Sequence, residues 1–276
     1  MTRRNRERVW GGSALAVIGV YLLAVGLPLL WMVLSSFKTR EQVSQLPPLI
    51  TFDPTLDNYR EVLRDSEFAR YLVNSTSVAL ASTVVSVGLG FLAAYAFVRL
   101  RRKRNDGLLF WILTMRMVPP LAVLVPFFSM MSAFGLYDTR HGLALVYTTF
   151  NLPIAVWLLL GYLDKIPVSI EEAAMTDGCS RLGAIRSVVL PLAAPGLFAT
   201  AVICMLLSWN EFAFALNLTG EEAKTLPVFL TAWDTQRGVN WGPMTASALL
   251  VVTPVIIAAA VFQKWLVRGL TFGATK

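Results

Sequence analysis

The chain has 276 residues, of which 56% are hydrophobic and only 15% charged, and its mean hydropathy is +0.61. This composition excludes an ordinary soluble globular protein, and the apolar residues form long runs, which are typical of membrane spans. The formal net charge is +7, but lysine and arginine flank the apolar runs instead of forming one basic face. We therefore interpret them as determinants of topology, not as a nucleic-acid surface.

Six apolar runs predict six membrane-spanning helices, because each is long enough to cross a bilayer core of about 30 Å. The sequence therefore indicates an all-α, polytopic membrane protein, with one transmembrane domain over residues 1–276. The predicted spans are residues 12–34, 71–98, 107–131, 142–162, 196–218 and 244–267.

The basic residues predict how these spans are oriented. Four arginines precede the first span, and five basic residues lie together at 99–106. With the connector 163–195 and the C-terminal tail, these segments hold more lysine and arginine than the alternate loops. Positive charge favours the cytoplasmic side, so both termini, the 99–106 cluster and the connector are expected in the cytoplasm.

The sequence offers little chemistry for catalysis or for a cofactor. Gly88, Gly90 and Ala93 fit the spacing of a dinucleotide fingerprint, but they lie in mid-span, where small residues serve helix packing. The chain has no G-x-x-x-x-G-K-[ST] phosphate loop, and His141 with nearby Asp138 makes no metal site. We expect a non-catalytic chain that binds no cofactor or metal itself.

The longest polar interruption in the C-terminal half is the connector 163–195. Ser169 and Glu172 form a capping-box pattern that predicts a short helix from Ile170, and Gly178 stands where a helix end favours positive φ. A second short helix is predicted at about 181–190, before two prolines at 191 and 195 end it. One face of the first helix is small and mostly apolar, which suits docking into a groove on another protein. This face consists of Ile170, Ala173, Ala174 and Asp177.

The connector also carries a family pattern. Glu172-Ala173-Ala174, then Gly178, then Val188-Val189-Leu190-Pro191 resembles the EAA loop of binding-protein-dependent ABC importer permeases, with valine at 188 where isoleucine is usual. Further segments resemble carbohydrate permeases of the MalG-like type. They are Asp57–Arg60, Ser208–Phe212, Leu226–Val228 and the ending Arg268–Lys276, which lacks the family's last glycine.

This resemblance implies the ABC importer permease fold in a bacterial or archaeal cell membrane. It also implies partners: a second homologous permease, a cytoplasmic ABC ATPase dimer that binds ATP and Mg²⁺, and an extracytoplasmic solute-binding protein that delivers a sugar or polyol. No nucleic acid is expected as a partner. The connector would hold the coupling helix that docks on the ATPase. The implied coupling residues are Glu171, Glu172, Ala173, Ala174, Asp177, Gly178, Leu190 and Pro191.

Two other functions remain open. One is an ABC importer permease for another solute, such as glycerol phosphate, because the sugar is implied by the resemblance alone. The other is a self-contained secondary transporter, which should contain inverted repeats and coupling-ion carboxylates within its spans. We find no repeat and one such carboxylate, Glu211.

Two ionisable residues lie deep in the predicted spans. At 1.5 Å per residue, Arg116 lies ~14 Å into the third span and Glu211 ~22 Å into the fifth. Charges at such depth are costly unless they face water or pair with each other. Three prolines between residues 119 and 126 should break the third span, as is tolerated where the backbone lines a cavity.

These residues allow two interpretations. In the first, arginine and amide side chains line a hydrated solute path and supply hydrogen bonds to a sugar, and Trp209 either faces the sugar ring or packs between helices. In the second, Arg116 and Glu211 form a structural ion pair. The candidate pathway residues are Arg116, Asn151, Trp209, Asn210 and Glu211.

Overall fold

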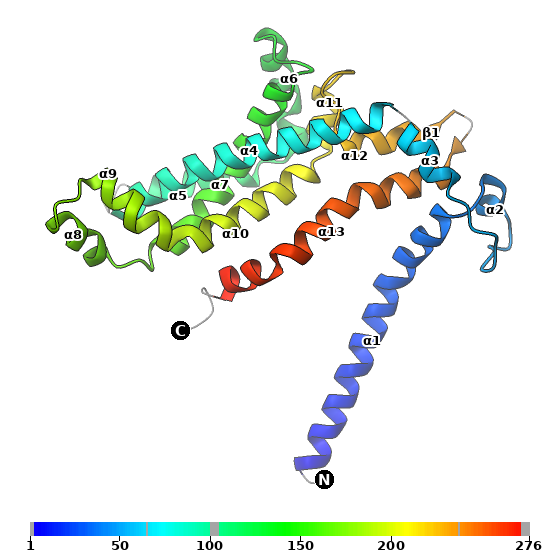
Figure 1. Cartoon of the computed structure of the whole chain (residues 1–276), viewed down its shortest axis with the longest axis horizontal. Helices are drawn as coiled ribbons and strands as arrows, with labels where there is room; N and C mark the ends of the chain where they lie inside the picture. Colours follow the sequence, from blue (N-terminus) through cyan, green and yellow to red (C-terminus); the bar gives the residue numbers. More distant parts are fainter. Residues whose placement is uncertain (1–2, 65, 100–104, 237, 272–276) are drawn as a thin grey trace. The chain divides into compact units, whose positions relative to one another are not determined.

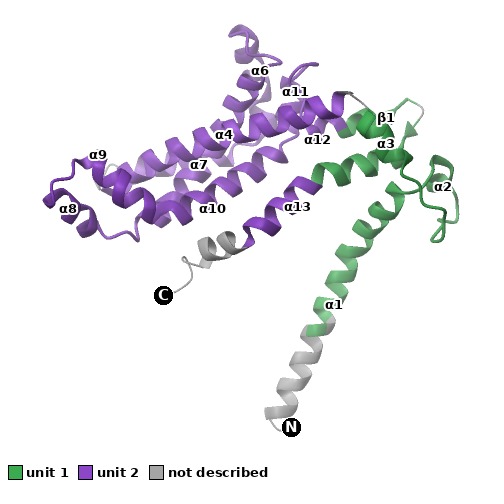
Figure 2. Ribbon diagram, viewed as in Figure 1, with its two compact units in different colours: residues 1–66, 230–252 green, residues 67–229, 253–276 purple. Residues whose placement is uncertain are grey.

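The computed structural model describes residues 3–64, 66–99, 105–236 and 238–271 (Figure 1). The chain divides into two units, which Figure 2 colours separately. Unit 1 comprises residues 1–66 and 230–252, and unit 2 comprises residues 67–229 and 253–276. The expectation of one transmembrane domain over residues 1–276 stays a prediction. Most of the predicted basic cluster (100–104) and the last five residues of the tail (272–276) lie outside the described residues.

Unit 1 holds the N-terminal helix and the segments around its end. Its elements are α1 (Arg3–Ser36), α2 (Arg40–Ser44), α3 (Asp57–Arg64), the 3₁₀ turn η4 (Leu230–Trp233), the antiparallel strands β1 (Asp234–Thr235) and β2 (Gly238–Val239), and the first part of α13 (Trp241–Thr271).

Asn58 of α3 fixes the end of α1. Its side-chain amide donates to the carbonyl oxygens of Ser36 and Lys38, each at 2.8 Å. The hydroxyls of Ser36 and Tyr59 also share a hydrogen bond of 2.8 Å. Because the last carbonyls of a helix have no partner within it, these bonds satisfy groups that would otherwise be left free.

Unit 2 holds the long helices α4, α7 and α10, with α8 and α9 at one end of them and α11 and α12 near the other (Figure 1). Its elements are α4 (Ser66–Arg99), α5 (Asn105–Thr114), the 3₁₀ turns η1 (Met115–Met117) and η2 (Pro120–Val123), α6 (Leu124–Ala133), α7 (Arg140–Leu163), α8 (Val168–Thr176), α9 (Arg181–Ala184), the π-helical turn η3 (Ile185–Val189), α10 (Leu190–Trp209), α11 (Ala213–Leu218), α12 (Leu226–Phe229) and the rest of α13.

The described residues contain five helices that are long and apolar enough to cross a membrane, and a sixth span if one bent pair counts as one. This confirms an all-α membrane protein. The five helices are Val17–Ser36, Glu67–Arg99, Arg140–Leu163, Arg181–Trp209 and Trp241–Gln263. The first, second, fourth and sixth predicted spans therefore match helices of the structure.

The third predicted span, 107–131, is broken rather than straight. The segments Gly107–Met117 and Pro120–Ala133 meet at an angle of 95°. The break lies at Pro119, whose backbone is extended, and a proline can neither donate a backbone hydrogen bond nor continue the preceding turn. The break predicted from the prolines is therefore confirmed.

The fifth predicted span, 196–218, is wrong at both ends. The helix runs on from the connector as Arg181–Trp209, so Pro191 and Pro195 do not end it. Pro191 falls in the first turn of α10, directly after the π turn η3, and in this position its missing N–H is tolerated. At the other end the chain leaves the helix at Asn210, and α11 is a separate short helix.

Close helix contacts support the packing within unit 2. One buried cluster joins α4, α7 and the π turn η3 through Phe91, Leu159 and Val189. A Cβ added to Gly90 would lie 2.8 Å from Cβ of Ala155, so only glycine fits this contact between α4 and α7. The packing interpretation of the Gly-x-Gly sequence is therefore confirmed for this glycine.

Candidate functional site

α8 begins two residues earlier than predicted. Pro167 stands at its N-cap, and no side chain caps the helix. The predicted capping box is wrong, because Ser169 lies inside the first turn and so cannot cap it. The Pro167 backbone, with φ −59° and ψ 134°, leads directly into the helix, and its carbonyl accepts a bond from the N–H of Ile170 at 3.3 Å.

The end of α8 follows the prediction. Gly178 has φ +94°, a conformation that favours glycine because it has no Cβ. The N–H of Cys179 donates to Ala174 at 3.0 Å, and the N–H of Gly178 donates to Met175 at 3.1 Å. These two bonds form a Schellman motif, which satisfies the last carbonyls of the helix.

The predicted docking face of α8 is open to solvent in this chain. Ile170 is 42% exposed, Ala173 and Asp177 are exposed, and Ala174 is half-buried. Glu172 is exposed as well. Leu190 and Pro191 lie in the first turn of α10, half-buried and exposed respectively. These residues present a small surface that can contact another protein.

Glu171 does not belong to that surface. It is 3% exposed, and its Oε2 accepts a bond from Nε of Arg99 in α4 at 2.8 Å. Its other oxygen accepts a bond from the hydroxyl of Tyr95. Glu171 therefore holds α8 to α4 and does not itself offer a surface to another protein, while its coupling role stays a prediction.

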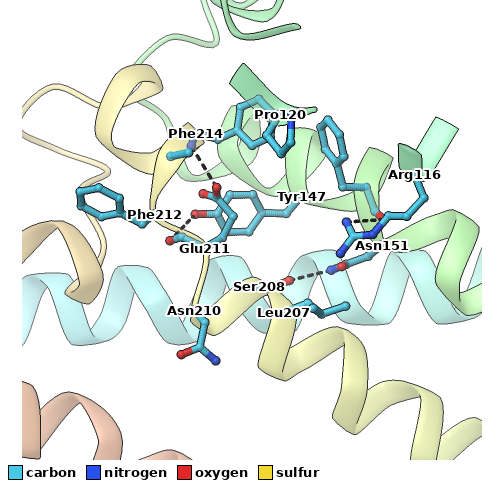
Figure 3. Close-up of a pocket in the computed structure, with 12 residues that line it drawn as sticks. Arg116, Pro120, Tyr147, Asn151, Leu207, Ser208, Asn210, Glu211, Phe212 and Phe214 are labelled. Carbon is cyan, nitrogen blue, oxygen red and sulfur yellow. Dashed lines mark hydrogen bonds between the residues drawn. The ribbon is translucent and has the colours of Figure 1, made fainter. Parts of the chain in front are cut away.

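A second candidate site is a pocket of about 360 Å³ in unit 2, lined by α7, the broken third span and the chain break after α10 (Figure 3). Arg116, Asn151, Asn210 and Glu211 all line it, so the structure brings four of the five predicted pathway residues to one place. Aromatic rings supply much of the rest of its wall. They are Tyr147, Phe150, Phe212 and Phe214.

Arg116 lies in η1, at the break of the third span, and is exposed. Its Nη1 donates to the carbonyl oxygen of Phe150 at 3.4 Å. Glu211 instead accepts bonds from the backbone N–H groups of Phe214 and Ala215, at 3.0 and 3.2 Å, and so caps α11. No ion pair joins Arg116 to Glu211 in the part of the chain that the structure describes. The structural-pair interpretation is therefore wrong.

Asn210 and Asn151 differ in what they can offer a solute. Asn210 is exposed, and its amide donates to the carbonyl of Leu206 at 2.8 Å; Figure 3 shows it pointing away from Glu211 and Tyr147. Asn151 is buried and donates to Oγ of Ser208 at 2.7 Å, which in turn bonds Oγ of Ser82 at 2.8 Å. Asn151 therefore also links α7, α10 and α4.

Trp209 is 6% exposed and does not line the pocket. Of the two roles considered for it, its burial favours packing between helices. Sequence reasoning missed Tyr147, because a tyrosine in an apolar run is unremarkable by itself. Its spacing of four residues from Asn151, which puts both on one helix face, was the available signal.

Asp138 organises the segment between α11 and α12. Its carboxylate accepts bonds from the backbone N–H groups of Glu221, Glu222 and Ala223 at 2.9–3.2 Å. Burial by itself raises the pKa of Asp138, but the backbone donors outweigh it, and the pKa lies below its ordinary value. Asn74 of α4 binds the same segment, donating to the carbonyl oxygens of Glu222 and Lys224 at 2.7 and 2.8 Å.

The chain is similar to known permeases along its whole length. It is 35% identical over 268 residues to the trehalose/maltose transport system permease protein MalG of Thermococcus litoralis, covering 95% of this chain and 96% of that protein. It is 36% identical over 278 residues to the trehalose transport system permease protein SugB of Mycobacterium tuberculosis, covering 99% and 98%.

Its fold also matches a solved structure. A chain of a bacterial ABC transporter involved in the import of the acidic polysaccharide alginate superposes with a TM-score of 0.81 and 26% identity, covering 96% of this chain and 98% of that chain. The family model of the binding-protein-dependent transport system inner membrane component matches residues 86–272. The chain therefore belongs to this family, the membrane permeases of ABC importers.

Proposed function

We propose that this chain carries a sugar or a related polyol across the membrane, after delivery by an extracytoplasmic solute-binding protein. The two relatives described above support this class, since they are named as permeases of a trehalose/maltose and a trehalose transport system. A permease for glycerol phosphate is the competing solute class. The secondary-transporter alternative is overturned by the family match.

The ATPase is a separate chain in this proposal, and it holds ATP and Mg²⁺. The exposed face of α8, with Ala173 at its centre and Gly178 at its end, docks on that ATPase in the cytoplasm. This places both termini in the cytoplasm of a bacterial or archaeal cell. A second, homologous permease completes the pathway, because six spans cannot easily enclose a sugar by themselves. Closure of the ATPase dimer then moves the helices as rigid bodies between two states.

The main observation in support of a solute pathway is the pocket at the broken third span. Breaks in membrane helices are tolerated where the backbone lines a cavity, and here Pro119 and Pro120 place Arg116 on the wall of one. The guanidinium supplies several hydrogen-bond donors. With the amide of Asn210 and the aromatic rings, the wall offers both the polar and the apolar contacts that a sugar needs.

Uptake by the complete complex, measured beside complex yield, tests this proposal. Arg116→Ala and Asn210→Ala should each lower uptake at least tenfold and leave the complex and its ATPase binding intact. Matched controls are Arg140→Ala and Asn217→Ala, since Arg140 is also exposed and Asn217 makes the same bond to the residue four before it. Normal uptake by both pocket variants would refute the pathway. Competition by glycerol phosphate but not by sugars would refute the solute class.

A further inference from the structure

Glu171 is the only buried side chain of α8, whose nine residues are all described. The remainder of the helix surface is open or half-covered. α8 also lies against α9 and η3, and Glu171 supplies its buried side-chain bond to α4. The short links at its two ends are turns. One contains Pro167, and the other contains Gly178 in a left-handed conformation. Neither turn continues the helix, so the contacts of α8 with its neighbours, including the bonds of Glu171, determine where the helix lies.

Arg99 holds two parts of the connector at once. Its Nε donates to Glu171 in the middle of α8, and its two terminal nitrogens lie 3.3 Å from the carbonyl oxygen of Ile166, just before the helix. The planar guanidinium fixes the direction of each bond. The Arg99 side chain is 9% exposed and that of Glu171 4%, so water does not compete strongly for this ion pair.

Tyr95, one turn before Arg99 on α4, completes the cluster. Its hydroxyl donates to the second oxygen of Glu171, and its ring stacks on Phe91 with centroids 6.3 Å apart. Both carboxylate oxygens are therefore occupied by groups of the same helix. A buried ion pair contributes little net stability compared with an apolar contact. It does set the position of one helix relative to another, since its bonds are directional.

We propose that Tyr95, Arg99 and Glu171 pass the movement of α8 to the span α4. Glu171 is a positioning residue: a displacement imposed on the exposed face of α8 reaches α4 through these bonds instead of being absorbed by the turns. This inference rests on the proposed docking of the ATPase on α8, and it names the contact through which docking acts on the membrane helices.

The test compares the solute transported per ATP hydrolysed by the complete complex in proteoliposomes. Glu171→Gln and Arg99→Met should leave the ATPase bound and hydrolysing, while transport per ATP falls at least tenfold. Tyr95→Phe removes one of the bonds and should reduce it less, by about two- to fivefold. Glu61→Gln and Arg140→Met replace an exposed glutamate and an exposed arginine elsewhere, and both should transport normally.

A double variant separates movement from folding. Glu171→Leu with Arg99→Met replaces the buried ion pair by apolar side chains, so it should restore any lost yield of complex. Transport per ATP should stay low, because the directional bonds are absent. Normal transport per ATP in the double variant, or in both single variants, would overturn the inference.

The docking proposal has its own variant. Ala173→Leu enlarges the exposed face of α8 and should release the ATPase from the complex. If Ala173→Leu releases the ATPase while Glu171→Gln transports normally, only the positioning role fails. If Ala173→Leu leaves the ATPase bound and transport normal, the docking proposal itself fails.

Discussion

Gly196→Ala tests how closely α10 approaches α7. A Cβ at residue 196 would lie 2.5 Å from Cγ of Tyr162 and 2.7 and 2.8 Å from its two Cδ atoms. The Cγ atom is only one bond from the Cβ of the tyrosine, so the ring cannot move away without changing its χ1 rotamer. Forcing a methyl group into a packed contact costs about 1–3 kcal/mol. All three contacts are far below van der Waals distance, so the cost should lie in the upper half of this range, at about 2–3 kcal/mol. Alanine recovers about 0.5–1 kcal/mol of helix propensity, and we therefore expect a net loss of about 1–2.5 kcal/mol.

Gly161→Ala is the matched control, because it adds the same methyl group next to Tyr162 on α7 with nothing within 4 Å. The thermal midpoint of the purified complex should fall by about 2–10 °C for Gly196→Ala. It is measured as the temperature at which half of the complex is no longer monodisperse. It should not fall for the control. Tyr162→Ala removes the ring, and adding Gly196→Ala to it should cause no further loss. Equal midpoints for the two glycine variants would refute the close contact.

Labelling of cysteines with a membrane-impermeant maleimide in intact cells tests the orientation. The reagent should label Asp53→Cys but not Cys179, which is exposed in the connector. The reverse result would contradict the topology. Asn58→Leu removes the two hydrogen bonds that the Asn58 amide donates at the end of α1, and it should destabilise unit 1 by about 1–3 kcal/mol. Proteolysis of the 37–55 segment should then be faster. Unchanged cleavage would rule out this role of Asn58. Asp138 has a pKa below its ordinary value of 3.8, so its contribution is present above pH 3.8 and is lost as the pH falls through the lower, folded-state value. Amide protection at residues 221–223 should therefore be lost only below that range, whereas Asp138→Asn should lose it at neutral pH. Equal protection in the variant and the parent at neutral pH would disprove the role of this carboxylate.

The break of the third span is a feature that residue type alone predicts. Two adjacent prolines at 119 and 120 prevent a continuous helix in any surroundings, and the structure breaks there. Gly178 is a similar case, because its predicted positive φ follows from the absence of a Cβ. The fifth span is a feature that residue type alone predicts wrongly. The same rule predicts that Pro191 ends a helix, but a π turn and a place in the first turn of α10 accommodate it.

The candidate site was also predicted only in part from the sequence. Residue type and depth singled out Arg116 and Glu211, and both line one pocket. Spacing could not reveal that Glu211 caps α11 or that Arg116 binds the carbonyl of Phe150. These partners are backbone groups that become available only where the chain breaks.

The sequence by itself determined that the protein lies in a membrane, the all-α fold, most of the spans and the family. Each of these depends on long apolar runs or on a motif of residues close together in the chain. Only the tertiary structure decided which face of α8 is held and which is free. Glu171 and Glu172 are neighbours of the same type, and they differ because helix geometry turns one towards α4 and the other towards solvent. Arg99 and Tyr95, more than 70 residues earlier in the chain, become partners of Glu171 only when α4 packs beside the connector.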